Sequence, residues 1–248
     1  MIDIHTHILP GVDDGAQDIY DCIEMAALAY ESGTETIVAT PHCNIPGLFD
    51  NYLGKEYIRV FQDTKEILKE EVPGITLLAG MEVFTTEDVP RLLTDGKIFP
   101  INRTRYVLME FDFQEDPAFA DRILRRVREV GAVPVIAHAE RYEFVQDDPG
   151  TVYRWKKAGY EIQVNKGSFM GRFGRRARRT AYGLLDHNLV SAVASDAHSP
   201  VRRTTCMADA YDELLGSCAK EYLDILFRTN PMRICNGEKT VQFEKIPF

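Results

Sequence analysis

The stretch MIDIHTHILPGVDDG, residues 1–15, decides the fold of this chain. Its first seven residues alternate as a β-strand does, so Asp3, His5 and His7 are expected on one face and Ile2 and Ile4 on the other. An Asp-Asp-Gly turn follows. Two imidazoles at a strand end indicate either a metal site or a strand that happens to carry histidines, and the rest of the chain decides between them.

Strand-like and helical patterns alternate along the chain. Strands are expected over 1–7, 35–42, 75–84, 105–111, 131–142, 160–168 and 189–198. Helices are expected over 17–32, 55–70, 117–130, 151–158, 174–187 and 205–228. This alternation, with no break in composition, predicts parallel βαβ units in a single domain over 1–248.

The placement of polar residues favours a barrel over an open sheet. No GxGxxG or Walker-type phosphate loop follows the first strand. Almost every expected strand instead carries His, Asp or Glu at its carboxyl end, which is where barrels build their active sites.

Nine residues at these strand ends are candidate metal ligands: His5, His7, Asp14, His42, Glu82, Glu110, His138, Asp196 and His198. Taken singly, Asp14 could be a turn residue, Glu110 a buried ion-pair partner and Asp196 a cap. Together they predict a site for two or three ions, because so many carboxylates gathered without a cation would be very costly. Mixed imidazole and carboxylate ligands suit Zn, Fe or Mn rather than Ca.

Charge and cysteine content exclude other function classes. The net charge of −9 argues against nucleic-acid binding, which needs a basic face. The five cysteines form no CxxC pair, and none is followed six positions later by the arginine of a cysteine-dependent phosphatase. No apolar run is long enough to span a membrane and no secretory pattern opens the chain, so we expect a cytoplasmic protein without membrane insertion.

The motifs together resemble one enzyme superfamily. HTH, Asp14, PH at 41–42, GME at 80–82, Glu110, AHAER at 137–141 and SDAH at 195–198 resemble the PHP (polymerase and histidinol phosphatase) phosphoesterases. The likeness is closer to the bacterial PHP-type protein tyrosine phosphatases of capsule and exopolysaccharide operons (the CpsB/YwqE type). These share the DIHxHI, VDDG, IAHxERY, QVN and ASDxH segments through nearly the whole chain.

The resemblance implies a distorted (β/α)7 TIM-like barrel, the PHP fold, with three divalent ions. One ion would be held by His5, His7, Glu82 and Asp196, a second by Glu82, Glu110 and His138, and a third by Asp14, His42 and His198. Manganese is the metal implied, with Fe, Zn or Mg as alternatives. Arg141 matches a phosphate-binding arginine of the branch, and Arg203 stands where a second is expected, although the adjacent Arg202 could serve instead.

The implied activity is hydrolysis of phosphotyrosine on a bacterial tyrosine kinase, whose phosphotyrosine-rich tail would be the substrate. A hydroxide bridging two ions would attack phosphorus, without a phosphocysteine. The alternatives are a phosphoesterase for a small metabolite such as histidinol phosphate, and a non-catalytic metal-binding module. Five arginines within 171–179 predict a solvated helix face, with docking of an acidic tail as the sharper hypothesis. The sequence leaves the oligomeric state open.

Overall fold

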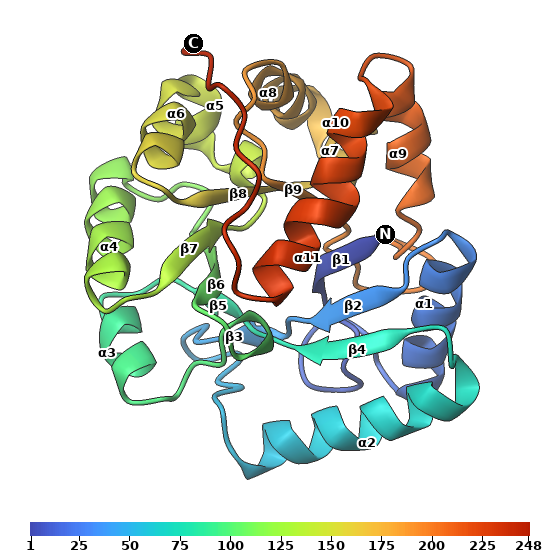
Figure 1. The fold of residues 1–248 in the computed structure, drawn as a ribbon. Coiled ribbons are helices and arrows are strands. Elements are labelled where there is room, and N and C mark those ends of the chain that lie inside the picture. Colours follow the sequence, from blue (N-terminus) through green and yellow to red (C-terminus); the bar gives the residue numbers. More distant parts are fainter.

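The computed structural model describes residues 1–248, and Figure 1 shows its strands gathered in a ring with the helices outside it. The strands are β1 (Ile2–Thr6), β2 (Thr36–Ala39), β3 (His42–Cys43), β4 (Thr76–Ala79), β5 (Glu82–Phe84), β6 (Tyr106–Glu110), β7 (Val133–Ile136), β8 (Glu161–Asn165) and β9 (Ala192–Ala194). All pairings between them are parallel, which confirms the α/β class expected from the sequence.

The nine strands occupy seven positions around the ring, because two of the seven expected strands are each divided into two. The second is divided into β2 and β3 at Thr40 and Pro41, and the third into β4 and β5 at Gly80 and Met81. One sheet runs β1-β2-β4 and the other β3-β5-β6-β7-β8-β9. The ring is completed between β9 and β1, where the His7 amide donates to Ala197 at 2.9 Å.

The helices are α1 (Ile19–Glu31), α2 (Lys55–Glu71), α3 (Val89–Thr94), α4 (Pro117–Glu129), α5 (Glu143–Asp147), α6 (Gly150–Lys157), α7 (Lys166–Phe169), α8 (Gly174–Asp186), α9 (Ala208–Leu215), α10 (Lys220–Asp224) and α11 (Asn230–Cys235). Local chemistry sets where they begin. The Asp116 carboxylate caps α4 by accepting from the Ala118 amide at 2.9 Å, and Pro117 occupies the first helical position.

Two expectations need correction. The segment 205–228 is not one helix: it breaks between α9 and α10, and a π-helical turn, Ile225–Thr229, leads into α11. The strict alternation expected for 1–7 is also wrong. The pairing of β1 with β2 shifts register between Asp3 and Thr6, so Ile4 packs inside the ring while His5 and His7 still converge. Such bulges re-aim side chains beside active sites.

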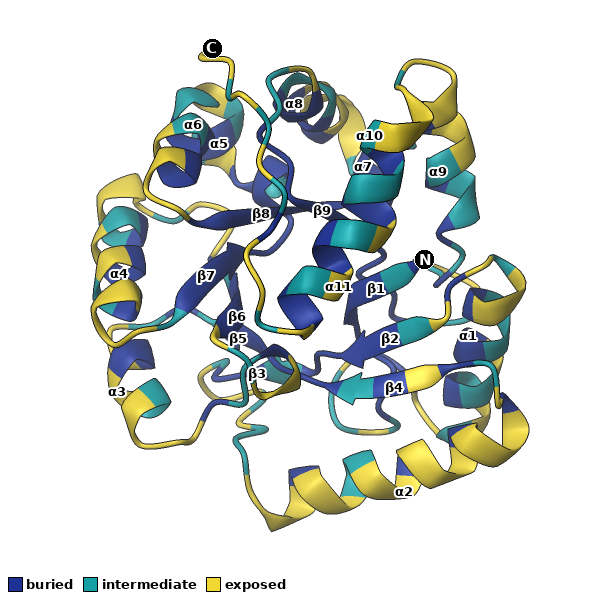
Figure 2. Cartoon of the chain, in the orientation of Figure 1, coloured by how far each residue is buried: buried dark blue, intermediate teal, exposed yellow.

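Two apolar clusters hold the ring and its helices together. The larger, of 51 buried residues, fills the space between the strands and the outer helices. The smaller, of 12 residues, joins Ile4, Val38, Leu108 and Val135 to Ile234 of α11 across the ring. Figure 2 shows most of the strand residues buried, β4 partly exposed, and the outer helix faces exposed. No helix is both long and apolar enough to cross a membrane.

Candidate metal centre

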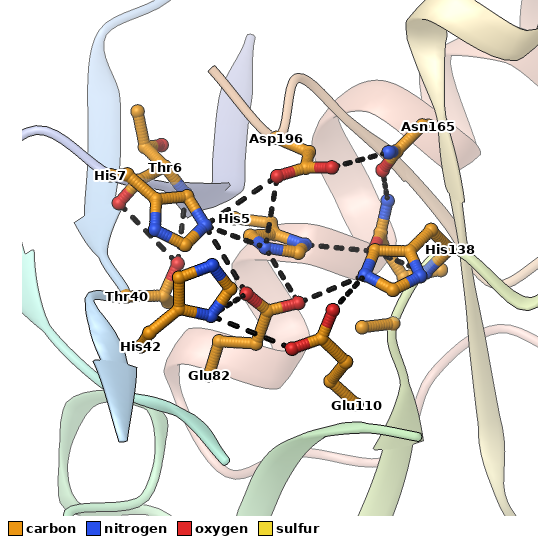
Figure 3. Close-up of polar contacts among 12 residues, drawn as sticks. His5, Thr6, His7, Thr40, His42, Glu82, Glu110, His138, Asn165 and Asp196 are labelled. Atoms are coloured by element: carbon orange, nitrogen blue, oxygen red, sulfur yellow. Dashed lines mark hydrogen bonds and ion pairs between the residues drawn. The ribbon is translucent and has the colours of Figure 1, made fainter. Parts of the chain in front are cut away.

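The nine sequence-predicted ligands lie together at the carboxyl ends of the strands, and Figure 3 shows seven of them facing one another. The ligand atoms of eight of them form three overlapping groups, each with all atoms within 4.8 Å: His7, Asp14, His42 and His198; His5, His7 and Asp196; and His42, Glu82 and Glu110. His138 is in none of these groups, but it contacts Glu82 and Glu110. The grouping differs in detail from the sequence-based one, because His7 and His42 each face two groups.

Glu82 occupies the centre of the cluster. Its Oε1 lies 3.1 Å from His5 Nε2 and 3.0 Å from His138 Nε2. Its Oε2 lies 3.2 Å from His7 Nε2 and 3.0 Å from His42 Nδ1. A fully buried carboxylate with imidazoles on both oxygens is placed to bridge two cations.

Asp14 and Glu110 lie toward the edge of the cluster. Asp14 Oδ1 is 3.5 Å from the Nε2 atoms of both His42 and His198. Glu110 Oε1 is 3.4 Å from His138 Nε2, and its Oε2 is 3.5 Å from His42 Nδ1. Their side chains are 57% and 13% exposed, so this edge is the solvent-accessible side of the cluster.

Two polar side chains fix the orientation of the paired histidines. His5 donates from Nδ1 to Gln163 Oε1 at 3.0 Å, and His7 donates from Nδ1 to Asp13 Oδ2 at 2.7 Å. Both rings therefore carry a proton on Nδ1 and point Nε2 into the cluster, where the two Nε2 atoms are 3.3 Å apart. Partners of this kind set the tautomer and basicity of metal-ligating histidines.

Gly15 allows the Asp-Asp-Gly turn to pack directly against His7. A Cβ at position 15 would lie 2.1 Å from the His7 carbonyl oxygen and 2.4 Å from the His7 Cβ. The turn is held by the Gly15 amide, which donates to Asp13 Oδ1 at 2.9 Å. This close approach is what brings both carboxylates of the turn to the histidines.

Asp196 uses its two oxygens differently. Oδ1 faces the Nε2 atoms of His5 and His7, each at 3.5 Å. Oδ2 accepts from Asn165 Nδ2 at 2.6 Å and also contacts Arg141 and Arg203, at 3.4 and 2.5 Å. Arg203 therefore lies at the site. Arg202 is exposed, and its backbone bonds Ser199.

Arg141 is held between two aromatic rings. Its guanidinium carbon lies 4.4 Å from the centre of the Phe113 ring and 4.2 Å from that of Phe173. Stacking on both sides leaves the edge of the guanidinium plane free to donate hydrogen bonds. The same Phe173 ring lies 5.8 Å from the guanidinium carbon of Arg203.

The charges of the cluster suit cations. Burial raises the pKa of Glu82, but the charges of His5 and His42 more than offset this and hold the pKa well below its usual value. Burial lowers the pKa of His138, yet hydrogen bonds to Glu110 and Glu82 raise it to about 9. Protons on the imidazoles therefore compensate the carboxylates, a role that divalent cations fill when they displace those protons.

Buried polar atoms without a hydrogen-bond partner also indicate that the cluster binds cations. His42 Nδ1 and Glu82 Oε2 are buried without a hydrogen-bond partner of good geometry, although they lie close together. Buried polar atoms of this kind are costly unless a ligand satisfies them. The donor set, all imidazole nitrogens and carboxylate oxygens, fits Mn, Fe or Zn.

Sequence reasoning missed four residues that support the cluster: Asp13, Gln163, Asn165 and Glu140. Gln163 also accepts from the His138 amide at 2.9 Å and donates to Asn165 Oδ1 at 2.8 Å, which links His5 to Asp196. Glu140 is fully buried and accepts from Ser168 Oγ and the Asn165 amide. The signal was present, because Gln163 and Asn165 alternate with the apolar residues of β8.

The chain matches a known family over almost its whole length. Residues 1–236 match the family described as capsular polysaccharide synthesis, CpsB/CapC. The chain belongs to the CpsB/CapC family. Within this family it is 38% identical over 199 residues to the tyrosine-protein phosphatase YwqE of Bacillus subtilis (strain 168), covering 80% of this chain and 78% of YwqE.

Other members of the CpsB/CapC family match over longer spans. The tyrosine-protein phosphatase CpsB of Streptococcus pneumoniae is 31% identical over 239 residues, which cover 94% of this chain and 98% of CpsB. A crystal structure from the work on B. subtilis YwqE and S. pneumoniae CpsB, described as unique metal-dependent tyrosine phosphatases, superposes with a TM-score of 0.93. It is 32% identical and covers 100% of this chain and 99% of its own.

The arginines of segment 171–179 lie on the outer surface around α8. Three of them pair with carboxylates: Arg172 with Asp209 at 3.6 Å, Arg176 with Asp147 at 2.5 Å, and Arg178 with Glu213 at 3.3 Å. All five are exposed, as the solvated helix face requires. Docking of an acidic tail stays a hypothesis.

Proposed function

We propose that this chain is a metal-dependent protein tyrosine phosphatase that acts on a tyrosine kinase controlling capsular or exopolysaccharide synthesis. The observation that carries the proposal is the convergence of nine imidazole and carboxylate side chains with two arginines on one carboxylate, Asp196. Membership of the CpsB/CapC family and the 38% identity to a tyrosine-protein phosphatase support it. Residues 1–248 would act as one catalytic unit.

We assign the nine residues to three divalent ions, with manganese as the expected metal. His5, His7, Glu82 and Asp196 would hold one, Glu82, Glu110 and His138 a second, and Asp14, His42 and His198 a third. When bound, such ions lower the pKa of water and polarise phosphoryl oxygens. Glu82 suits the shared position because His5 and His7 of the first set and His138 of the second contact its carboxylate.

The arginines bind the phosphate group in this proposal. A guanidinium presents paired N–H donors that match two phosphate oxygens. Arg141 is held flat by Phe113 and Phe173, so little freedom is lost when it binds. Arg203 Nε donates to the Asp196 carbonyl at 3.2 Å and Nη2 contacts Asp196 Oδ2, which leaves Nη1 for the substrate. Both charges would stabilise the phosphoryl group as it transfers.

The leaving group fits this arrangement. Tyrosine leaves as a phenolate with a pKa near 10, so it needs less help from a general acid than an alkyl alcohol does. All five cysteines are free, and burial raises the pKa of Cys22, Cys43 and Cys235 to about 12, which leaves these thiols unsuited to nucleophilic attack. Free thiols also suit the reducing cytoplasm, where a kinase tail would be met.

The test compares two substrates on one metal-loaded protein. We expect kcat/KM for a phosphotyrosine peptide to exceed that for histidinol phosphate, because an alkyl alcohol leaves poorly without a general acid. A chelator should abolish turnover, and added Mn²⁺ should restore it. A preference for histidinol phosphate would instead support the metabolite phosphoesterase, and no turnover of either would support a non-catalytic module.

The control replaces all five cysteines with serine. Turnover should persist in this variant, since no cysteine contacts the metal cluster. Loss of turnover with the fold and the metal content unchanged, or turnover that survives the chelator, would overturn the proposed mechanism.

A further inference from the structure

A second charged cavity lies at the opposite end of the ring from the metal centre. It has a volume of about 540 Å³ and lies at the amino ends of β6, β7 and β8. The C-terminal segment, residues 236–248, crosses the ring there (Figure 1). Six basic side chains line it: Arg105, Arg128, Lys156, Lys157, Lys239 and Lys245. One acidic residue, Glu161, lines it as well.

The positive charge of this basic cavity is almost uncompensated. Glu161 pairs with the buried Lys156, its Oε2 lying 2.8 Å from Lys156 Nζ. The other five cations have no carboxylate within 4.0 Å, although the chain as a whole carries 38 acidic and 29 basic residues. Like charges gathered in a concave surface focus a positive potential there, and repulsion among them disfavours the folded state until an anion neutralises them.

The floor of the basic cavity is built by buried hydrogen bonds. Lys156 Nζ donates to Ser191 Oγ at 2.8 Å as well as to Glu161. Glu161 Oε1 accepts from Thr240 Oγ1 at 2.6 Å, which ties the C-terminal segment to β8. The segment is tied again where Asn230 accepts from the Val241 amide at 2.7 Å. Lys239 and Lys245 are therefore carried on a chain fixed to the barrel.

The basic cavity is distinct from the metal centre. Glu161 begins β8 at the cavity, whereas Asn165 ends β8 at the metal centre, so the length of a five-residue strand, about 13 Å, separates them. None of the residues that line the cavity contacts a predicted metal ligand. No charge at the metal centre therefore accounts for these cations.

We propose that this basic cavity binds a small molecule bearing a diphosphate group. Five unpaired cations exceed what one phosphate group, with about two negative charges, would neutralise. Three of the 14 lining residues are hydrophobic, so recognition rests on ion pairs rather than on an apolar ring. A concave site of this volume suits a small ligand better than the flat surface of a membrane.

The test measures binding of ADP, inorganic diphosphate and orthophosphate by calorimetry. The protein is loaded with Mn²⁺ and the free metal concentration is kept constant. We expect ADP and inorganic diphosphate to bind, and orthophosphate to bind at least ten-fold more weakly. Tighter binding of ADP would identify a nucleotide as the source of the diphosphate, and equal binding would identify the diphosphate group alone.

A matched pair of variants locates the site. Arg105→Gln/Lys245→Gln should weaken diphosphate binding at least ten-fold. Lys97→Gln/Arg125→Gln removes one lysine and one arginine that are exposed, have no carboxylate partner and lie outside the cavity, and it should leave binding unchanged. Both should hydrolyse an aryl phosphate as the unchanged protein does, because neither touches the metal centre.

Four results would overturn the proposal. One is the absence of diphosphate binding at millimolar concentration. Another is equal weakening by the two variants, which would indicate general attraction of anions. The third is binding that survives Arg105→Gln/Lys245→Gln but is lost in Asp196→Asn, which would place the ligand at the metal centre. Preferential binding of phosphatidylglycerol vesicles over ADP would count against a small ligand as well.

Discussion

At the scale of single residues, the metal centre depends on side chains that orient the ligands as much as on the ligands themselves. Asp13 and Gln163 each accept a hydrogen bond from Nδ1 of one histidine, so both Nε2 atoms face inward. The neighbouring carboxylates of Asp13 and Asp14 therefore contact different histidines. Asp14 faces His42 and His198, while Asp13 orients His7 from behind.

Replacing Asp13 tests this orientation. Every group within hydrogen-bond distance of its two oxygens is a donor: His7 Nδ1, the His42 amide and the Gly15 amide. Asp13→Asn places an NH2 group where no acceptor exists, so we expect metal affinity about 10- to 100-fold lower. Competition with a metal-binding dye measures the affinity. Asp212→Asn, at an exposed position, is the control, and equal affinity in both variants would contradict the assignment.

The aromatic pair around Arg141 gives a second prediction. Phe173→Leu removes one of the two rings that stack on the Arg141 guanidinium. A partly desolvated cation–π contact is worth about 1–2 kcal/mol, so kcat/KM for an aryl phosphate should fall about 5- to 30-fold. Metal content should not change. Phe119→Leu is the matched control, because Arg122 lies 5.3 Å from its ring on the outer surface of α4. An equal fall in both variants would argue against a role in positioning Arg141.

At the scale of elements, β8 connects the two ends of the barrel. Glu161, Gln163 and Asn165 alternate along it and share one face. Gln163 and Asn165 hold His5 and Asp196, whereas Glu161 meets Lys156 and Thr240 at the opposite end. One strand therefore supports the metal centre at its carboxyl end and anchors the C-terminal segment at its amino end.

The buried pair at the start of β8 predicts a large effect on stability. The Lys156 and Glu161 side chains are 4% and 8% exposed, so removing one partner leaves the other charge buried and unpaired. Lys156→Met should lower the free energy of unfolding by ~3–5 kcal/mol, measured by urea denaturation. Lys156→Met/Glu161→Gln should recover part of the loss. Lys220→Met is the control, because Lys220 forms an exposed pair with Asp224, and its urea midpoint should be unchanged. Similar shifts of the urea midpoint in Lys156→Met and Lys220→Met would contradict this account.

At the scale of the whole molecule, the ring gathers charges that the chain keeps far apart. His5 and His198 are separated by nearly the full sequence, yet both contact Asp196. Closing the ring between β9 and β1 places them there. The cluster has more imidazole and carboxylate groups than hydrogen bonds can satisfy, so its charge balance depends on bound protons or bound metal ions.

This balance predicts proton release when metal binds. Burial lowers the pKa values of His7, His42 and His138, but contacts with carboxylates raise all three above the usual value, that of His138 to about 9. The His138 imidazole is then protonated at neutral pH without metal, and a bound cation must displace its proton. Affinity should therefore rise with pH from 6 toward about 9 and level off above the raised pKa.

Calorimetry of Mn²⁺ binding in two buffers of different ionisation enthalpy counts the protons released. The thermal midpoint should rise with free Mn²⁺ as well, because the ion binds the folded state. Affinity independent of pH over this range, or a binding enthalpy that is the same in both buffers, would show that the imidazoles are neutral before the metal binds.

Much of the fold could be predicted because its signals are local. The alternation of strands and helices located all seven strand positions of the ring, and caps such as Asp116 set helix starts within one or two residues. The π-helical turn was missed because no proline or glycine lies within Ile225–Thr229. The break between α9 and α10 was missed although Gly216 ends α9. The bulge in β1 was missed because it arises from pairing with β2.

The sequence by itself determined which side chains can form the metal centre, because residue type and position at a strand end are local properties. Only the tertiary structure decided how they are oriented and grouped. Asp13 rather than Asp14 lies behind His7, and Arg203 rather than Arg202 reaches Asp196, because these choices depend on bulges and on contacts across the ring. The basic cavity likewise exists only in the folded chain, since its cations come from four separate segments.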